Sequence, residues 1–286
     1  MLWVWKLLKE TVVNFMSDKA LSHGAAIAYY TVFAVAPLLV IVIAVAGLFF
    51  GEKAAQGAIA SQLSDLMGDA GARGIEALIR SASDRGSGLA ASAVGFGTLI
   101  LAASSVFVEM QAALNTIWKT KANHPTLKHF VRARAASFGL VVTVGFLLLV
   151  SLVVSTAISA LDKYIDHFFP SAHLFFQGVN FVISFTLISM LFGAIYKVLP
   201  DKRIAWGDVL IGAVATSFMF TVGKSLIGLY IGSSAVTRAY GAAGGLIIVL
   251  LWVYYSAQIF LLGAEFTKAY AERHGSHAPR ALQPKN

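Results

Sequence analysis

The chain has 286 residues, of which 58% are hydrophobic and 13% charged, and its mean hydropathy is +0.75. A soluble domain carries about a quarter charged residues because its surface faces water, so this composition excludes a water-soluble globule. The absence of cysteine excludes disulfides, thiol catalysis and thiolate metal sites. No soluble block gathers the basic residues, so the net charge of +8 indicates a basic face against anionic lipid, and no nucleic-acid partner is expected.

The first 17 residues are predicted to form an amphipathic helix in the membrane interface. At helical spacing they divide into an apolar stripe (Trp5, Leu8, Val12 and Phe15) and a polar stripe (Lys6, Glu10, Asn14 and Ser17). Such a helix buries its apolar face near the headgroups, where tryptophan is favoured. The segment lacks the pattern of a cleavable signal peptide, which has a basic start, a short apolar run and a small-residue cleavage site.

Six later stretches are long and apolar enough to cross, as helices, a hydrocarbon layer of roughly 30 Å. They are residues 24–51, 86–118, 135–161, 174–199, 204–232 and 239–266. Barrel strands would be short and alternating, so the predicted fold class is all-α, a polytopic membrane protein with six transmembrane helices. We expect a single transmembrane domain over residues 1–270 and a polar, disordered tail over residues 271–286.

The basic residues predict the orientation of these helices. Fifteen lysines and arginines fall in the N-terminal segment, the second and fourth connections and the tail, whereas seven fall on the other side. Basic residues are enriched on the cytoplasmic side of a membrane. Both termini are therefore predicted to be cytoplasmic.

The outer segment after the first span, residues 52–85, is predicted to form two short amphipathic helices on the periplasmic surface. Each half has one apolar face, formed by Ile59, Leu63, Leu66 and Met67 in the first and by Ile75, Leu78 and Ile79 in the second. Three glycines, Gly68, Gly71 and Gly74, are expected to break the helix between the two halves.

Lys224 is a charged residue inside the fifth predicted span, and such residues are rare and often functional. With Ser217, Thr221 and Gly228 it forms one stripe of polar and small residues. This stripe indicates the bundle interior or a wet cavity. The alternative is that Lys224 extends its side chain to the outer interface, and both interpretations stay open.

Glu109, near the end of the second span, is a second candidate, because an ionised carboxylate in a membrane helix needs a partner. Gln111 and Asn115 on a neighbouring face fit interhelical hydrogen bonds that hold helices together. His23, at the edge of the first span, fits a hydrogen-bonded structural residue better than a ligand.

The sixth span carries a further stripe of Tyr254, Gln258 and Glu265. Glu265 lies at the inner boundary, where it is either solvated or paired with a cation from a loop. In the first span Pro37 predicts a kink, because proline removes a helical hydrogen bond and crowds the carbonyl of Phe33. Broken helices mark many transport sites, but proline kinks also occur in inert membrane helices.

The motifs of hydrolytic and nucleotide-dependent enzymes are missing, including the phosphate-binding loop and the H-E-x-x-H and G-x-S-x-G sequences. A metal-dependent nuclease needs a tight group of histidines and acids, whereas the seven histidines are scattered. We expect no enzyme activity, no metal site and no cofactor. Small residues four apart, such as Gly241 and Gly245, favour packing within one copy, and a homo-oligomer stays an alternative.

Three elements of the sequence resemble one family of membrane proteins. They are YKVLP (196–200) followed by WGD (206–208), the Y-G-x-x-G, L-L-W-x-Y and G-A-E patterns within residues 239–270, and A-x-A-Y followed by P-L within residues 25–45. In order and spacing they are similar to the YihY/BrkB (virulence factor BrkB) family over about residues 15 to 270. The matching positions are Tyr29, Pro37, Tyr196, Pro200, Asp208, Tyr240, Gly241, Trp252 and Glu265.

The resemblance implies a six-helix protein of the bacterial inner membrane with a transport role. The family also carries a virulence-factor label and a historical ribonuclease name, and no catalytic residues follow from it. Among the matching positions, we treat Pro37, Tyr196, Pro200, Asp208, Tyr240 and Gly241 as structural candidates.

We therefore expect a transporter or exporter of a small solute, an ion or a lipid-like molecule. Its pathway would be lined by Glu109, Ser217, Thr221, Lys224, Tyr254, Gln258 and Glu265. Two alternatives stay open. One is a non-transporting scaffold for the cell envelope that docks partners on the outer helices. The other is a membrane-associated ribonuclease, which would need clustered acids near the basic loop at residues 119–134.

Overall fold

The computed structural model describes residues 2–83, 104–120, 172–233, 240 and 244–277. Its helices are α1 (Leu2–Ser17), α2 (Ala20–Phe50), α3 (Glu52–Ser83), α6 (Ala172–Val198), α7 (Trp206–Ser233) and α9 (Gly244–Arg273). Residues 104–117 are helical as well. The described residues form helices and turns without any strand, so the all-α prediction is confirmed for this part of the chain.

Three described helices are long and apolar enough to cross a membrane, namely Gly178–Val198, Trp206–Ile231 and Gly244–Arg273. A fourth candidate is the bent pair Ala20–Val35 and Leu38–Leu48 within α2. These four correspond to the predicted spans 24–51, 174–199, 204–232 and 239–266. Most of the predicted span 86–118 and all of the predicted span 135–161 lie outside the described residues, so the count of six stays a prediction.

The fourth candidate, α2, is bent where the sequence predicts a kink. Its two halves bend by 43° at a break between Val35 and Leu38, and Pro37 lies in that break. Proline has no N–H for the helical hydrogen bond, and its ring crowds the carbonyl one turn earlier. The bend lies where the sequence predicts a kink at Pro37.

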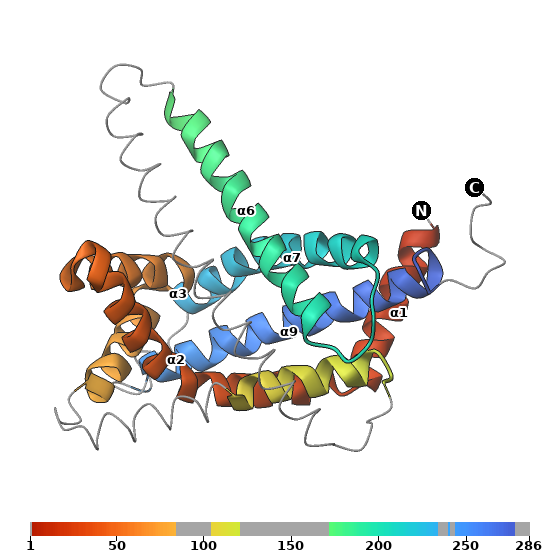
Figure 1. Cartoon of the computed structure of the whole chain (residues 1–286), viewed down its shortest axis with the longest axis horizontal. Coiled ribbons are helices and arrows are strands. Elements are labelled where there is room, and N and C mark those ends of the chain that lie inside the picture. Colours follow the sequence, from red (N-terminus) through yellow and green to blue (C-terminus); the bar gives the residue numbers. More distant parts are fainter. Residues whose placement is uncertain (1, 84–103, 121–171, 234–239, 241–243, 278–286) are drawn as a thin grey trace.

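The central helix of the described bundle is α9. It packs against α1, α2, α3 and α7, while α6 packs against α7. Figure 1 shows α2, α7 and α9 side by side, with α3 at one end of the bundle and α1 at the other. The first turns of α6 extend away from the other labelled helices. The position of each neighbouring element is therefore set largely by its contact with α9.

A buried tyrosine joins α6, α7 and α9. The Tyr196 hydroxyl donates a hydrogen bond to the carbonyl oxygen of Phe260 (2.7 Å) and lies 3.1 Å from Thr216 Oγ1. The rings of Tyr196 and Phe260 also stack, with centroids 5.4 Å apart. A buried hydroxyl is costly unless it is hydrogen-bonded, so this arrangement holds the three helices in one register. Tyr196 has the structural role that was predicted for it.

The outer segment α3 consists of two helices, as predicted, that meet at a kink at Gly68, where φ is 75° and ψ is 167°. The break falls at the first of the three predicted glycines, because a positive φ is open to glycine at little cost. The apolar faces of the two halves pack inward, with Ile59, Met67 and Ile75 buried. A Cβ at Gly74 would lie 2.7 Å from the backbone of Gly245 at the start of α9, so α3 closes one end of the bundle.

The opposite end is formed by α1 and the last turn of α9. Arg273 Nε donates to Glu10 Oε2 at 2.5 Å, and the rings of Trp3 and His274 meet edge to face. The beginning and the end of the described chain therefore lie at the same end of the bundle. The predicted apolar stripe of α1 is largely uncovered, since Trp5, Leu8 and Val12 are exposed.

The close packing of α7 on α9 predicts opposite effects for two glycine substitutions. A Cβ at Gly263 would overlap Thr216 Oγ1, whereas one at Gly228 would meet nothing within 4 Å. Gly263→Ala should lower the free energy of unfolding by about 1–3 kcal/mol through overpacking. The matched variant Gly228→Ala should leave it unchanged or raise it by up to about 1 kcal/mol, because alanine favours helix. Unfolding in mixed micelles by added SDS measures both, and equal stabilities would contradict this packing.

Candidate functional site

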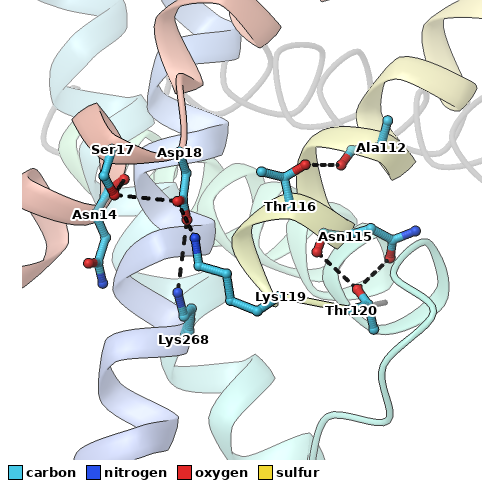
Figure 2. Close-up of polar contacts among 9 residues, drawn as sticks. All are labelled: Asn14, Ser17, Asp18, Ala112, Asn115, Thr116, Lys119, Thr120 and Lys268. Atoms are coloured by element: carbon cyan, nitrogen blue, oxygen red, sulfur yellow. Dashed lines mark hydrogen bonds and ion pairs between the residues drawn. The ribbon is translucent and has the colours of Figure 1, made fainter. Parts of the chain in front are cut away.

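Four charged side chains from three distant segments meet where α1 joins α2. Asp18 lies in the turn between α1 and α2, Lys119 follows the helix at residues 104–117, and Glu265 and Lys268 lie on α9. Figure 2 shows Lys119 and Lys268 reaching Asp18 from different elements. We refer to Asp18, Lys119, Glu265 and Lys268 as the charge cluster.

Local backbone geometry brings the first two members together. Lys19, the residue after Asp18, and Lys119 both adopt the left-handed conformation, with φ of 56° and 49°. This conformation is uncommon for residues other than glycine, and at Lys19 it lies at the N-cap of α2. The chain therefore turns sharply at both points, which directs Asp18 and Lys119 toward each other.

Asp18 is the centre of the cluster. Its side chain is 4% exposed, its Oδ1 accepts hydrogen bonds from Lys119 Nζ and from Ser17 Oγ, and its Oδ2 lies 3.9 Å from Lys268 Nζ. The two lysines differ in environment, because the side chain of Lys119 is 61% exposed and that of Lys268 only 6%. Asp18 thus links a buried cation to one that water can reach.

Glu265 lies one turn before Lys268 on α9 and is fully buried, with 0% exposure. Neither of its carboxylate oxygens has a hydrogen-bond partner among the described residues. The charges that act on it come from Lys268, Asp18 and Lys119. Buried polar atoms are nearly always hydrogen-bonded in folded proteins, so an unpaired buried carboxyl group marks Glu265 as the best candidate for a functional residue here.

The predicted candidate Glu109 has the partner that a buried carboxylate requires. His23 Nδ1 and Glu109 Oε1 lie 2.7 Å apart, and both side chains are partly buried. This contact joins α2 to the helix at residues 104–117. The hydrogen-bonded role predicted for His23 is confirmed.

Gln258, two turns before Glu265, contacts the first turn of α2. Its Nε2 donates to the carbonyl oxygen of Leu21 at 3.5 Å, and its Oε1 is buried without a partner among the described residues. A Cβ at Gly24 would overlap the Gln258 amide, so the two helices approach closely here. Tyr254, on the same stripe, is partly buried.

The α7 candidates lie apart from the charge cluster. Ser217 is fully buried, and its hydroxyl has no partner among the described residues. Thr221 and Lys224 are partly buried, and no ion pair of Lys224 is found within the described ranges. Its neighbour Gly223 packs against Ile259, about two helical turns from Glu265. The structure therefore brings Gln258 and Glu265 near α2, but it does not gather all predicted pathway residues at one point.

Two predicted structural residues fasten the connections around the cluster. Asp208 Oδ2, in the first turn of α7, accepts hydrogen bonds from the backbone N–H and the hydroxyl of Ser276 (3.1 and 2.6 Å). This contact ties the segment after α9 to the start of α7. Pro200 is buried just beyond the end of α6, where proline cannot continue a helix. Tyr240 is exposed, and Gly241 lies outside the described residues.

The helix-joining role predicted for Gln111 and Asn115 is confirmed, because both donate to the carboxylate of Asp201 at 3.2 and 2.7 Å. No local pattern marks Asp201 or Asp18, since both lie in polar turns outside the apolar stretches. Lys268 could have been found, because it stands three residues after Glu265 on the same helix.

Taken together, the fold and the cluster define a helical membrane protein with charged residues buried at one end of its bundle. Its sequence belongs to the family described as Virulence factor BrkB, whose family model matches residues 11–286. The predicted resemblance to the YihY/BrkB family is thereby confirmed.

Related curated proteins are bacterial membrane proteins. A UPF0761 membrane protein of Alteromonas mediterranea is 29% identical over 67% of this chain and 64% of its own length. One of Aggregatibacter aphrophilus is 28% identical over 91% of this chain and 90% of its own. The UPF0761 membrane protein YihY of Salmonella typhimurium is 31% identical over 63% and 60%.

The chain thus spans less than two thirds of the length of several relatives that it matches. No solved structure matches this chain.

The different burial of the two lysines predicts different costs for removing them. Lys268→Met should lower the free energy of unfolding by about 3–5 kcal/mol, because it leaves the buried carboxyl groups without their buried cation. Lys119→Met should cost less than about 1 kcal/mol, because the exposed end of an ion pair is well solvated. The same SDS titration measures both variants. Equal losses, or a larger loss for Lys119→Met, would contradict the burial described for the cluster.

Proposed function

We propose that this protein transports a small solute, an ion or a lipid-like molecule across the bacterial inner membrane. In this proposal the charge cluster is the gate at the cytoplasmic end of the pathway. The observation that carries the proposal is Glu265, a fully buried carboxyl group without a partner among the described residues. Ionisable groups kept inside membrane bundles commonly serve ion or substrate pathways.

The different exposure of the two lysines in the charge cluster supports a gate. Lys119 reaches from the surface to Asp18, which is almost fully buried. The ammonium group of Lys119 is well solvated when it leaves Asp18, and Asp18 keeps the buried Lys268 nearby, so this pair should open more easily than the contact with Lys268. Opening it uncovers Asp18 and brings water toward Glu265, whereas the buried Lys268 stays in place.

The break in α2 supports a hinge for this gate. The half of α2 before Pro37 begins at Ala20, two residues after Asp18, and carries His23 and Gly24. Its contacts include the contact of His23 Nδ1 with Glu109 Oε1 and the hydrogen bond of Gln258 to Leu21. Polar contacts of this kind can exchange with water, and discontinuous helices are a recurring element of transport sites. A swing of this half-helix about Pro37 would open the contacts together.

The described contacts also support six crossings with both termini in the cytoplasm. Gly74 of α3 lies beside Gly245 at the start of α9, whereas Lys119 lies beside Asp18 at the other end of α9. The end of α6 lies near Lys119, since Asp201 binds Asn115. Gly74 and Lys119 therefore lie at opposite ends of α9, which fits one crossing between them. The 27-residue helix α6 ends on the Lys119 side, which fits a further crossing between Lys119 and the start of α6. The excess of basic residues at the Lys119 end supports a cytoplasmic position for that end.

The two alternatives have less support. The apolar faces of α3 that could dock a partner are turned inward, with Ile59, Met67 and Ile75 buried, so no described feature favours the scaffold. For a ribonuclease, no group of three or more histidines and acids suited to a metal ion occurs within the described ranges.

The gate predicts a change in flux for Lys119→Ala in proteoliposomes. Potassium, chloride, glycine and a fluorescent short-chain phospholipid serve as probes, and wild-type protein should move at least one of them faster than empty liposomes. Lys119→Ala should raise the passive rate of that probe several-fold, because the gate loses its outer cation. Lys9→Ala, an exposed lysine of α1, is the matched control and should behave as wild type. If neither wild type nor Lys119→Ala moves any probe, the protein is not a transporter of these classes.

The hinge predicts the opposite result for Pro37→Ala. An alanine restores the missing helical hydrogen bond and straightens α2, so the half-helix should swing less and the flux of the same probe should fall. Cysteine pairs for distance measurement can be introduced freely because the chain has no cysteine. Labels at residues 21 and 261 should show a narrower distance distribution in Pro37→Ala than in wild type. An unchanged distribution together with unchanged flux would exclude the hinge.

A further inference from the structure

Three carboxylate oxygens in the charge cluster lack hydrogen-bond donors. They are Asp18 Oδ2, Glu265 Oε1 and Glu265 Oε2, and each is buried without a hydrogen-bond partner in the part of the chain that the structure describes. Lys268 Nζ is 3.9 Å from Asp18 Oδ2, which is beyond hydrogen-bonding distance. The cluster therefore offers acceptors without enough donors.

The two carboxyl groups also contact each other. Asp18 lies close enough to Glu265 to act on it as a charge and to form a side-chain hydrogen bond with it once a proton is present. Two ionised carboxylates have no hydrogen to share, so this contact is a hydrogen bond only when one of the groups is protonated. Two adjacent carboxylates in one buried site disfavour double ionisation and tend to share a proton.

A count of the buried charges also points to one bound proton. Of the four groups, Asp18, Glu265 and Lys268 are buried, whereas Lys119 is 61% exposed and its charge is largely screened by water. The buried set thus holds two negative charges and one positive charge. One proton makes this set neutral and supplies a donor to the unpaired oxygens at the same time.

We propose that Asp18 and Glu265 bind one proton between them, as a carboxylic acid hydrogen-bonded to a carboxylate, within the buried end of the bundle. The groups that face this site are Asp18 from the α1–α2 turn, Lys119 from the end of the helix at residues 104–117, and Lys268 from α9. The helices packed against α9, namely α1, α2, α3 and α7, supply no further charge to it within the described ranges.

Proton binding does not depend on transport, but its use as the coupling step rests on the proposed function. When Lys119 leaves Asp18, water reaches the pair, and the proton can pass to solvent as the carboxylates are hydrated. When the gate closes again, desolvation of the two carboxylates favours uptake of a proton. Opening and closing would then be linked to proton release and proton binding at one site.

Infrared difference spectroscopy of the purified full-length protein in lipid nanodiscs tests the binding. Wild type at neutral pH should show the carbonyl stretch of a protonated carboxylic acid that shifts in D₂O and disappears at alkaline pH. The band should be lost in Glu265→Gln and in Asp18→Asn, because each variant removes one half of the pair. It should remain in Glu76→Gln, an acid of α3 outside the cluster.

A stability measurement keeps the test decisive if a variant folds poorly. A folded state that holds a proton which the unfolded state lacks loses stability as the pH rises. Wild type should therefore lose stability between neutral and alkaline pH, whereas Glu265→Gln, which mimics the protonated acid, should lose less. Absence of the band in folded wild type, or a sodium-dependent stabilisation that Glu265→Gln abolishes, would overturn proton binding in favour of no ligand or of a metal cation.

The outcomes for binding and transport are separable. A band without any probe flux leaves the proton site intact and removes the proposed function. Flux without the band removes the proton site and leaves the proposed function. Flux with the band, but at a rate that is the same at every pH in wild type and in Glu265→Gln, removes the coupling role alone.

Discussion

Asp18 is the counter-charge on which three distant parts of the chain converge. A charge inside a low-dielectric bundle is costly unless an opposite charge or hydrogen bonds compensate it, and α9 carries two such charges, Glu265 and Lys268, one turn apart. Asp18 and Lys119 come to them from the α1–α2 turn and from the end of the helix at residues 104–117. Separation of these segments would leave at least one buried cation unpaired. This requirement fixes how the N-terminal third of the chain sits on α9.

The interfaces of α9 are of two physical kinds. Toward α6 and α7 the contacts are close-packed, with the buried hydroxyl of Tyr196 and the glycine at 263 leaving no free volume. Toward the first half of α2 they include the hydrogen bond from Gln258, and the same half of α2 also contacts the helix at residues 104–117 through His23 and Glu109. Close-packed cores resist gradual deformation, whereas polar contacts can exchange partners with water. The bundle therefore combines a rigid side with a side that can separate, and Pro37 lies on the second.

Much of the fold could be predicted from the sequence, because its signals are local. The apolar stretches that became α2, α6, α7 and α9 are set by bilayer thickness, and the break at Pro37 and the positive φ at Gly68 follow from single residues. The charge cluster could not be predicted in the same way. Lys119 and Lys268 contributed to the sequence analysis only as basic residues that set the orientation. Asp18 lies in a polar turn, and its partners are 101 and 250 residues away in the chain, so only tertiary packing reveals the pairing.

Lys224 is the opposite case, because the sequence singled it out and the structure places it outside the charge cluster. Its place inside an apolar stretch made it the clearest candidate, because an isolated charge there is expensive. Hydropathy cannot tell whether the side chain points to a cavity, to the interface or to a neighbour. The structure leaves Lys224 partly exposed and outside the charge cluster, and its neighbour Gly223 packs against Ile259, about two turns before Glu265 on α9. Snorkelling and a second polar site on the α7 stripe, with the unpaired hydroxyl of Ser217, both remain consistent with this position.

Glu265 is the one member of the charge cluster that the attachment of the α1–α2 turn to α9 does not explain. Asp18 is sufficient to hold the α1–α2 turn against α9, because both Lys119 and Lys268 pair with it. Glu265 adds a second buried acid beside Asp18 and receives no hydrogen bond from the described residues. Buried ion pairs contribute little to stability compared with apolar residues of the same size, so an ionised Glu265 would weaken the interface that the other three form. A protonated Glu265 removes this conflict, because it becomes a hydrogen-bond donor to Asp18 and leaves the buried set neutral. The same residue is then stabilising when the bundle is closed and ready to ionise when water enters, which is the property that a proton-linked gate requires.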